Sequence, residues 1–106
     1  MFNIEPGTFK RTVKIPVPVD DGFEEQSVVI TYNVMPIDRT RALETGQDVV
    51  DFVHETVNTV DGLVDGKKNP LEWNAEVQAS FWNLPYVFNP VRDAYAEAIN
   101  KAREKN

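Results

Sequence analysis

The sequence contains no cysteine and a single histidine, His54. The absence of cysteine excludes a disulfide scaffold, a thiolate metal site and a thiol nucleophile, and it fits a reducing compartment. A zinc site built from several imidazoles is likewise unavailable within one chain. No apolar run approaches the length that spans a bilayer, and residues 1–10 lack the basic-then-apolar layout of a signal peptide. We therefore expect a cytoplasmic protein that does not bind membranes.

Basic residues are also few. The chain has 11 Lys and Arg against 17 Asp and Glu, which gives a net charge of -6. An acidic chain repels the phosphate backbone, and the basic residues are spread along the sequence, so we expect no binding to nucleic acid. The 106 residues, 42% hydrophobic and 26% charged, predict one globular domain over residues 1–106. Within it we expect a β-hairpin over 9–35 and a helical part over 37–106.

The clearest hydrophobic pattern runs from Phe9 to Met35. Odd positions from Phe9 to Val19 are mostly apolar, and even positions are polar or proline, which is the alternation of an extended strand. A second run rich in β-branched residues begins at Ser27, after the turn sequence Asp20-Asp21-Gly22, and this order predicts a hairpin. The hairpin requires a cover for its apolar face, because isolated hairpins are marginally stable.

Two prolines, Pro16 and Pro18, fall on the polar face of the first strand. Proline cannot donate to a β-ladder, so this strand is predicted to lie at a sheet edge. Protection of that edge against aggregation is the favoured interpretation of the two prolines. A docking edge for a partner strand is the alternative.

Pro36 ends the second strand, and residues 37–45 are compatible with one or two helical turns capped by Asp38 and ended by Gly46. Residues 48–60 carry valines at helical spacing. Their many β-branched side chains oppose a helix, but the periodicity over a dozen residues favours one, and we predict a helix here.

Residues 61–70 hold two Asp-Gly pairs and predict a turn-rich connector, with a short hairpin as an option. Asn74 is placed to cap a short helix over 75–84. A last helix is predicted over residues 91–103, with Asn89 as N-cap and Pro90 as its first residue. The expected fold class is therefore α+β, an N-terminal antiparallel hairpin or small sheet followed by three to four short helices.

The sequence shows no catalytic constellation. His54 has Asp51 and Glu55 as helical neighbours, which is also the pattern of a solvated polar face. There is no glycine-rich phosphate loop, no nucleophile elbow and no regular calcium loop. We expect no enzymatic activity, no cofactor and no metal. The alternative is a small hydrolase or metal-dependent enzyme that uses His54 with the nearby carboxylates.

Aromatic residues are concentrated in the second half of the chain. Core packing must account for some of them, but a small domain can hardly bury them all, so one or two are expected on a contact surface. The candidate partner-binding residues are Trp73, Phe81, Trp82, Tyr86, Phe88 and Tyr95.

The order of these features resembles the tail assembly chaperones of long-tailed bacteriophages. The resemblance is carried in the first half by Phe9, the strand Val13-Lys14-Ile15-Pro16-Val17-Pro18, the turn Asp21-Gly22 and the step Val34-Met35-Pro36. In the second half it is carried by Val60-Asp61-Gly62-Leu63-Val64-Asp65, Asn69-Pro70-Leu71-Glu72-Trp73-Asn74, Leu84-Pro85, Tyr86-Val87 and Asp93-Ala94-Tyr95-Ala96-Glu97-Ala98. The chain departs from the family at Asp61, where a tryptophan is expected, and at Asp38-Arg39, where acidic residues are common.

The resemblance implies a non-enzymatic assembly factor in the cytoplasm of a bacterial host. Such a chaperone binds and solubilises the tape measure protein, helps to recruit tail tube subunits and is absent from the mature virion. The resemblance is also compatible with a homo-oligomer. The alternative class is a virion structural protein, such as a tail completion or head–tail connector subunit.

Overall fold

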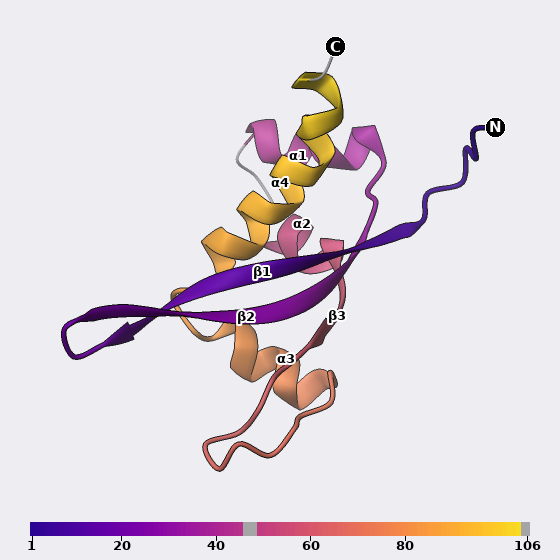
Figure 1. The fold of residues 1–106 in the computed structure, drawn as a ribbon. Coiled ribbons are helices and arrows are strands. Elements are labelled where there is room, and N and C mark those ends of the chain that lie inside the picture. Colours follow the sequence, from indigo (N-terminus) through magenta and orange to yellow (C-terminus); the bar gives the residue numbers. More distant parts are fainter. Residues whose placement is uncertain (46–48, 105–106) are drawn as a thin grey trace.

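A computed structural model describes residues 1–45 and 49–104 of the chain. In these residues three strands and four helices follow one another in the order β1-β2-α1-α2-β3-α3-α4 (Figure 1). Their bounds are β1 Thr8–Val19, β2 Gly22–Asn33, α1 Ile37–Thr45, α2 Val49–Thr56, β3 Val57–Asp61, α3 Ala75–Trp82 and α4 Phe88–Glu104. The predicted α+β class is confirmed.

Strands β1 and β2 form the predicted hairpin. They pair antiparallel from Thr8↔Asn33 to Val19↔Gly22, which leaves Asp20-Asp21 as a two-residue loop. Gly22, at φ 141°, supplies a backbone conformation that residues with a Cβ rarely adopt. Strand β2 begins five residues before the predicted Ser27, because ladder pairing also holds the polar segment that follows the turn.

The strand order β1-β2-β3 places β1 at an edge, as its two prolines predicted. Beyond the strand the ladder continues with the Val34 N–H, which donates to the Gly7 carbonyl at 3.1 Å. Hydrogen-bonded pairs alternate along an antiparallel ladder, so odd residues of β1 bond to β2 and even residues point their backbone groups outward. Pro16 and Pro18 are even, and the ladder therefore loses no donor at either residue.

The helix predicted over residues 48–60 is wrong from Val57 onward. Helix α2 ends at Thr56, and Val57–Asp61 is strand β3, paired antiparallel with β2. The β-branched residues that opposed a helix thus determine the structure here, because the open edge of β2 offers them a pleated, half-buried position.

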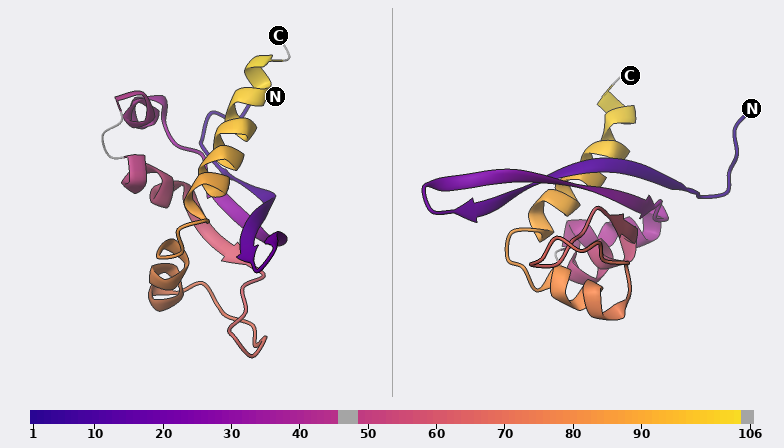
Figure 2. Two further views of the ribbon diagram at one scale, coloured as in Figure 1. Left: turned by 90° about the vertical axis from the view of Figure 1, so that its left-hand side faces the viewer. Right: turned by 60° about the horizontal axis from the view of Figure 1, so that its bottom comes forward.

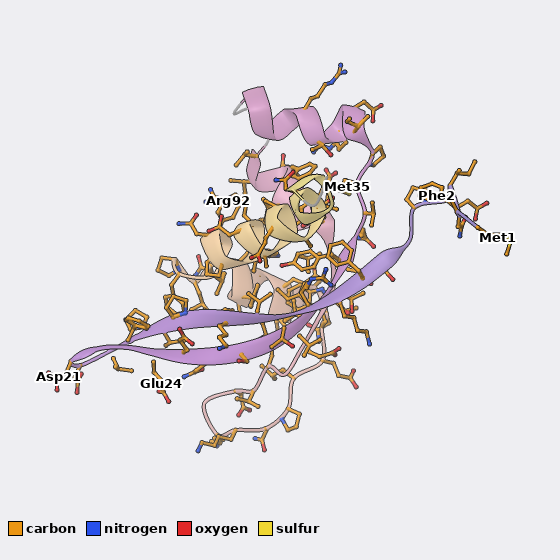
Figure 3. All side chains as sticks on the ribbon, turned by 45° about the horizontal axis from the view of Figure 1, so that its top comes forward. Met1, Phe2, Asp21, Glu24, Met35 and Arg92 are labelled. Atoms are coloured by element: carbon orange, nitrogen blue, oxygen red, sulfur yellow. The ribbon has the colours of Figure 1, made fainter. Side chains whose placement is uncertain are left out.

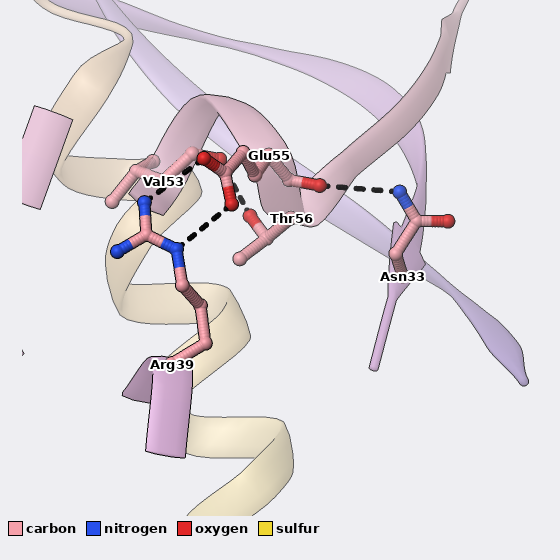
Figure 4. A network of polar contacts seen from close by, with 5 residues as sticks. All are labelled: Asn33, Arg39, Val53, Glu55 and Thr56. Carbon is pink, nitrogen blue, oxygen red and sulfur yellow. Dashed lines mark hydrogen bonds and ion pairs between the residues drawn. The ribbon is translucent and has the colours of Figure 1, made fainter. Parts of the chain in front are cut away.

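A network of polar contacts stabilises the point where helix α2 ends and strand β3 begins (Figure 4). The Asn33 side chain donates to the Glu55 carbonyl at 3.2 Å, and the Thr56 hydroxyl donates to the Val53 carbonyl at 2.6 Å. The Glu55 carboxylate accepts two bonds from the Arg39 guanidinium, at 2.9 and 3.0 Å. These bonds satisfy helix-end carbonyls and tie α1 to the end of α2.

Helix boundaries confirm some predicted caps and correct others. Asn74 caps α3, since its side chain accepts from the Val77 N–H at 3.0 Å. Helix α4 begins at Phe88, so Asn89 is not its N-cap, although Pro90 still lies in the first turn, where backbone N–H groups lack helical partners. Helix α1 begins at Ile37, so Asp38 lies inside its first turn, where its carboxylate accepts from the Arg39 N–H.

The end of α3 and the connector after β3 also test the predicted elements. Helix α3 ends at Trp82 and not at Leu84. The connector forms the short hairpin that was one option, with a bridge between Val64 and Pro70. The predicted helix stop at Gly46 lies outside the described residues.

The helices lie on one face of the sheet and leave the other face open (Figure 2). The core fills the space between them and consists of Val13, Ile15, Val28, Ile30, Tyr32, Phe52, Val53, Val60, Phe81, Val87, Val91 and Tyr95. Helical cover extends over the half of the hairpin near Thr8 and Asn33, and the turn end projects past it (Figure 1). Burial follows this cover, since the inward side chains of β2 are buried from Val28 onward and exposed before it.

Candidate binding groove

Four aromatic rings pack together at the centre of the core. Tyr32 stacks on Phe9 with ring centroids 5.3 Å apart, and Tyr95 lies 5.6 Å from Tyr32 and 6.0 Å from Phe9. Phe52 meets Tyr95 edge-on at 6.0 Å. The rings come from β1, β2, α2 and α4, so this cluster joins the sheet to two of its covering helices.

The two tyrosines of this cluster are hydrogen-bonded through their hydroxyls. Tyr32 donates to the Val91 carbonyl of α4 at 2.8 Å, and the Tyr95 oxygen accepts from the Met35 N–H at 3.0 Å. Burial raises the pKa of both phenols above the ordinary value, because a phenolate would lose its hydration there. Tyr95, a predicted partner-binding residue, is 4% exposed and has a structural position in the core.

A second aromatic group surrounds α3. Trp73 and Trp82 both meet the buried Phe81 edge-on, at 5.5 and 5.1 Å. Trp82 also stacks on the His54 ring at 4.2 Å, across the gap between α2 and α3. Phe81 is 4% exposed, whereas both tryptophans are half-buried and keep part of their surface in solvent.

His54 is therefore a packing residue. Burial lowers its pKa, and the nearby Asp51 carboxylate partly opposes this effect. Glu55 is paired with Arg39, which lowers the pKa of the Glu55 carboxyl. Within the described part of the chain, no three His, Asp or Glu side chains gather in a way that could hold a metal ion.

A groove of about 190 Å³ opens where the projecting part of the hairpin leaves the helices. Its walls come from β1 and β2, from the connector after β3 and from the α3–α4 corner. The lining residues are Ile15, Val17, Gln26, Ser27, Val28, Gly62, Leu63, Val64, Phe81, Leu84, Tyr86 and Val87. The groove is thus mainly aliphatic and aromatic, with the polar residues Gln26 and Ser27 on the β2 side.

The rim of the groove is apolar and partly exposed. Val64 is 54% and Leu84 40% exposed, and Val19 on the adjoining inward face of β1 is 48% exposed. Glu24 shares that face, opposite Val17, and Asp20 and Asp21 follow at the turn, so carboxylates border the rim on the hairpin side. Figure 3 shows Asp21 and Glu24 at this end of the molecule.

The structure separates the six predicted partner-binding residues. Phe81 and Tyr86 line the groove, and Trp73 packs behind Phe81. Trp82 faces His54, Tyr95 belongs to the central cluster, and Phe88 lies under the Arg92 guanidinium at 5.8 Å. These six positions do not form one surface.

Sequence reasoning missed the aliphatic walls of the groove. Val17 and Val19 continue the apolar face of β1 past Ile15, whereas the facing residues of β2 become Gln26 and Glu24. That mismatch between paired strands was visible in the sequence, and it marks where the inward face stops being covered. Leu84 gave no such signal, because it was assigned to a longer α3.

No helix in the described residues is long and apolar enough to cross a membrane. Comparisons with protein families, with curated proteins and with solved structures find no match to this chain.

Proposed function

We propose that this protein is a phage tail assembly chaperone without enzymatic activity. It binds and solubilises the tape measure protein and helps to recruit tail tube subunits during assembly. It acts in the cytoplasm of the bacterial host and is absent from the mature virion. This proposal rests on the order of motifs along the chain together with the chemistry of the groove.

The observation that supports it most directly is the partly exposed apolar groove beside α3. A chaperone for a long helical client has to cover apolar client side chains reversibly. At about 190 Å³ the groove is smaller than the ~300–1,000 Å³ typical of small-molecule sites. It exceeds the ~150 Å³ that holds a benzene ring, so it fits one large apolar side chain of a protein partner.

The charge of the chain supports the same role. A net charge of -6 keeps a chaperone–client complex soluble by repulsion between complexes. Several copies along one client increase overall affinity without any single strong contact. A shallow groove that holds one side chain is suited to this kind of repeated, individually weak binding.

Co-expression with the tape measure protein of the same genome tests the proposal. We expect the unchanged chain to raise the soluble fraction of the tape measure protein and to co-purify with it. Leu84→Glu, which introduces a charge at the groove rim, should reduce both effects. The control is Ile37→Glu on α1, an aliphatic site that is 70% exposed, against 40% for Leu84, and does not line the groove, and it should behave like the unchanged chain.

Unchanged solubility of the tape measure protein and no co-purification would refute the chaperone role. Mass spectrometry of purified particles separates it from the structural alternative. A tail completion or connector subunit would be found in finished particles in stoichiometric amounts, and a chaperone would not.

A further inference from the structure

The outer edge of β1 is open along its first half. Even residues of β1 point their backbone groups away from β2, and in the described part of the chain no protein group accepts from the N–H groups of Lys10, Thr12 and Lys14. Pro16 and Pro18 have no N–H, so they close the second half of the edge to a further strand. The part before Pro16 is long enough for a strand of the usual ~5–6 residues.

Helix α4 continues past this edge on the inner side of the sheet (Figure 1, Figure 2). A hollow of about 280 Å³ lies between the edge and the helix, and its lining residues are Arg11, Thr12, Ala94, Glu97 and Ala98. A strand added to β1 would therefore lie under the projecting part of α4. Its inward side chains would enter the hollow, as in other sites where an extended peptide joins a sheet edge.

We propose that this edge binds an extended segment of a partner protein with acidic side chains at alternate positions. The segment joins the sheet as a further strand, and its backbone pairs with Lys10, Thr12 and Lys14. Side chains opposite these residues lie on the open face of the sheet, beside the two lysines. The intervening side chains face α4 and are apolar, because they lie against Ala94 and Ala98.

The charge of β1 selects this partner. The strand has three basic residues, Lys10, Arg11 and Lys14, and no acidic one, although the whole chain has a net charge of -6. The Arg11 guanidinium donates to the Lys10 carbonyl at 3.0 Å and so lies at the edge, and that carbonyl keeps a second lone pair for a partner N–H. Glu25 approaches Lys14 at 3.9 Å, but both side chains are exposed, and such a pair is weak.

The surroundings of the edge determine where the acidic side chains belong. Glu97 lines the hollow, so a carboxylate that entered it would be repelled, whereas the open face offers the two lysines. At physiological ionic strength charges are screened beyond about 8 Å. Nearby cations therefore influence the bound segment more than the acidic residues elsewhere on the chain do.

A second copy of this chain is a poor occupant of the edge. An antiparallel pair of β1 strands centred on Thr12 places Lys10 of each copy opposite Lys14 of the other. A pair centred on Lys10 or Arg11 places that residue opposite itself. Like charges directly opposite on neighbouring strands are destabilising, whereas opposite charges are stabilising. The occupant is therefore an acidic strand and not β1 of another copy.

Amide NMR of the isotope-labelled full chain, titrated with a short capped peptide of alternating glutamate and valine, tests the proposal. We expect saturable shift changes at Lys10, Thr12 and Lys14, with a dissociation constant of about 1 mM or below at physiological salt. Their N–H groups should also exchange more slowly with solvent. A matched peptide with lysine in place of glutamate should bind about tenfold more weakly.

Substitution of Thr12 tests the backbone pairing. Thr12→Pro removes the central N–H of the edge and, as at Pro16, costs no bond to β2, so the fold is retained. It should raise the dissociation constant of the glutamate peptide about tenfold or more. Thr12→Ala keeps the N–H and should bind like the unchanged chain.

Charge reversal gives a second readout that does not depend on Thr12. Lys10→Glu combined with Lys14→Glu should reverse the preference, so that the lysine peptide binds more tightly than the glutamate peptide. The control is Lys67→Glu combined with Lys68→Glu, on the connector after β3, which changes the net charge equally. This control should retain the preference for glutamate.

Several outcomes would overturn the proposal: no binding, equal binding of the two peptides, or binding that survives Thr12→Pro. Shifts of the edge amides that grow with protein concentration in the absence of peptide would overturn it too, because they would show that a second copy covers the edge. The edge shares no residue with the groove beside α3, so none of these outcomes bears on the proposed chaperone function.

Discussion

At the scale of the residue, two buried tyrosines join the sheet to α4 through their hydroxyl groups. Tyr32 is fully buried, and its hydroxyl bonds the sheet to α4 through the Val91 carbonyl. A buried hydroxyl that keeps its partner contributes about 0.5–1.5 kcal/mol, and one left without a partner costs more. The Tyr95 oxygen accepts from the Met35 N–H and so also joins α4 to the end of β2.

The loss of stability on removal of the Tyr32 hydroxyl should be measurable. We expect Tyr32→Phe to lower the free energy of unfolding by about 1 kcal/mol, because the buried Val91 carbonyl loses a donor. Urea unfolding at neutral pH measures the change. Tyr86→Phe removes the same atom from a half-buried ring at the groove, and a loss as large as that of Tyr32→Phe would contradict our account.

The raised pKa values of these two phenols predict that the stability of the folded chain falls at alkaline pH. Burial raises the pKa of Tyr32 and Tyr95 in the folded chain, so above the unfolded value of about 10 the folded state binds more protons than the unfolded state. Stability is fully present below pH ~10 and should fall above it, by at most about 1.4 kcal/mol per pH unit for each phenol. Urea unfolding between neutral pH and pH ~11 should show a shallower fall for Tyr32→Phe, and an identical slope would refute this explanation.

At the scale of the element, backbone hydrogen bonds decide which substitutions each segment tolerates. Odd residues of β1 bond to β2, and even residues face the free edge. Helix α3 has a side-chain cap in Asn74, whereas Asn89 lies inside α4. Both distinctions lead to paired substitutions in which the sequence change is the same and the expected result differs.

The loss of stability caused by a proline substitution on β1 should depend on whether the position is odd or even. Lys14→Pro, compared with Lys14→Ala, should cost little stability, because the Lys14 N–H points to the free edge as at Pro16 and Pro18. Arg11→Pro, compared with Arg11→Ala, should cost about 1–3 kcal/mol, since it leaves a carbonyl of β2 without its donor. Thermal unfolding of the four variants measures the difference, and equal costs would contradict the assigned ladder.

Asn74 and Asn89 should likewise differ in how much stability is lost when each is replaced by alanine. Asn74→Ala removes the acceptor for the Val77 N–H and should cost about 1 kcal/mol of stability. Asn89→Ala places a good helix former inside α4 and should leave stability unchanged or slightly higher. Chemical unfolding of both variants tests this, and a larger loss for Asn89→Ala would restore it as a cap.

Sequence reasoning was least accurate for β3. The valines from Val49 to Val60 fit a helical period, and only the many β-branched side chains of residues 48–60 argued against a helix. Local propensity could not decide the question, because β3 gains its stability from pairing with β2, more than twenty residues away in sequence. The hairpin of β1 and β2 was predictable because its pairing is local and a turn sequence marks it.

At the scale of the whole molecule, the helices cover the sheet unevenly. Helices protect the half of the hairpin near Thr8 and Asn33, while the turn end and residues 1–7 project past them (Figure 1). The groove beside α3 is also open to solvent. Local stability should follow this division, because segments with few buried apolar contacts open at low free energy. The groove that we propose to bind the client lies in the open part.

Native-state hydrogen exchange should map this division. Amides of Ile30 and Tyr32, on the central strand under the helices, should exchange slowest and report global unfolding. Amides of β2 near the turn, such as Glu24, should exchange much faster although they belong to the same strand. Uniform protection along β2 would show that the projecting end is covered in solution.

The sequence by itself determined the hairpin, the edge position of β1, the Asn74 cap and the α+β class, because each depends on local pattern or on backbone chemistry within a few residues. Tertiary structure alone decided that Val57–Asp61 is a strand, that Phe81 and Tyr95 are buried, and that Ile15, Leu63 and Leu84 meet in one groove. These outcomes depend on contacts between residues far apart in the chain, and a count of aromatic residues or a local period carries no information about them.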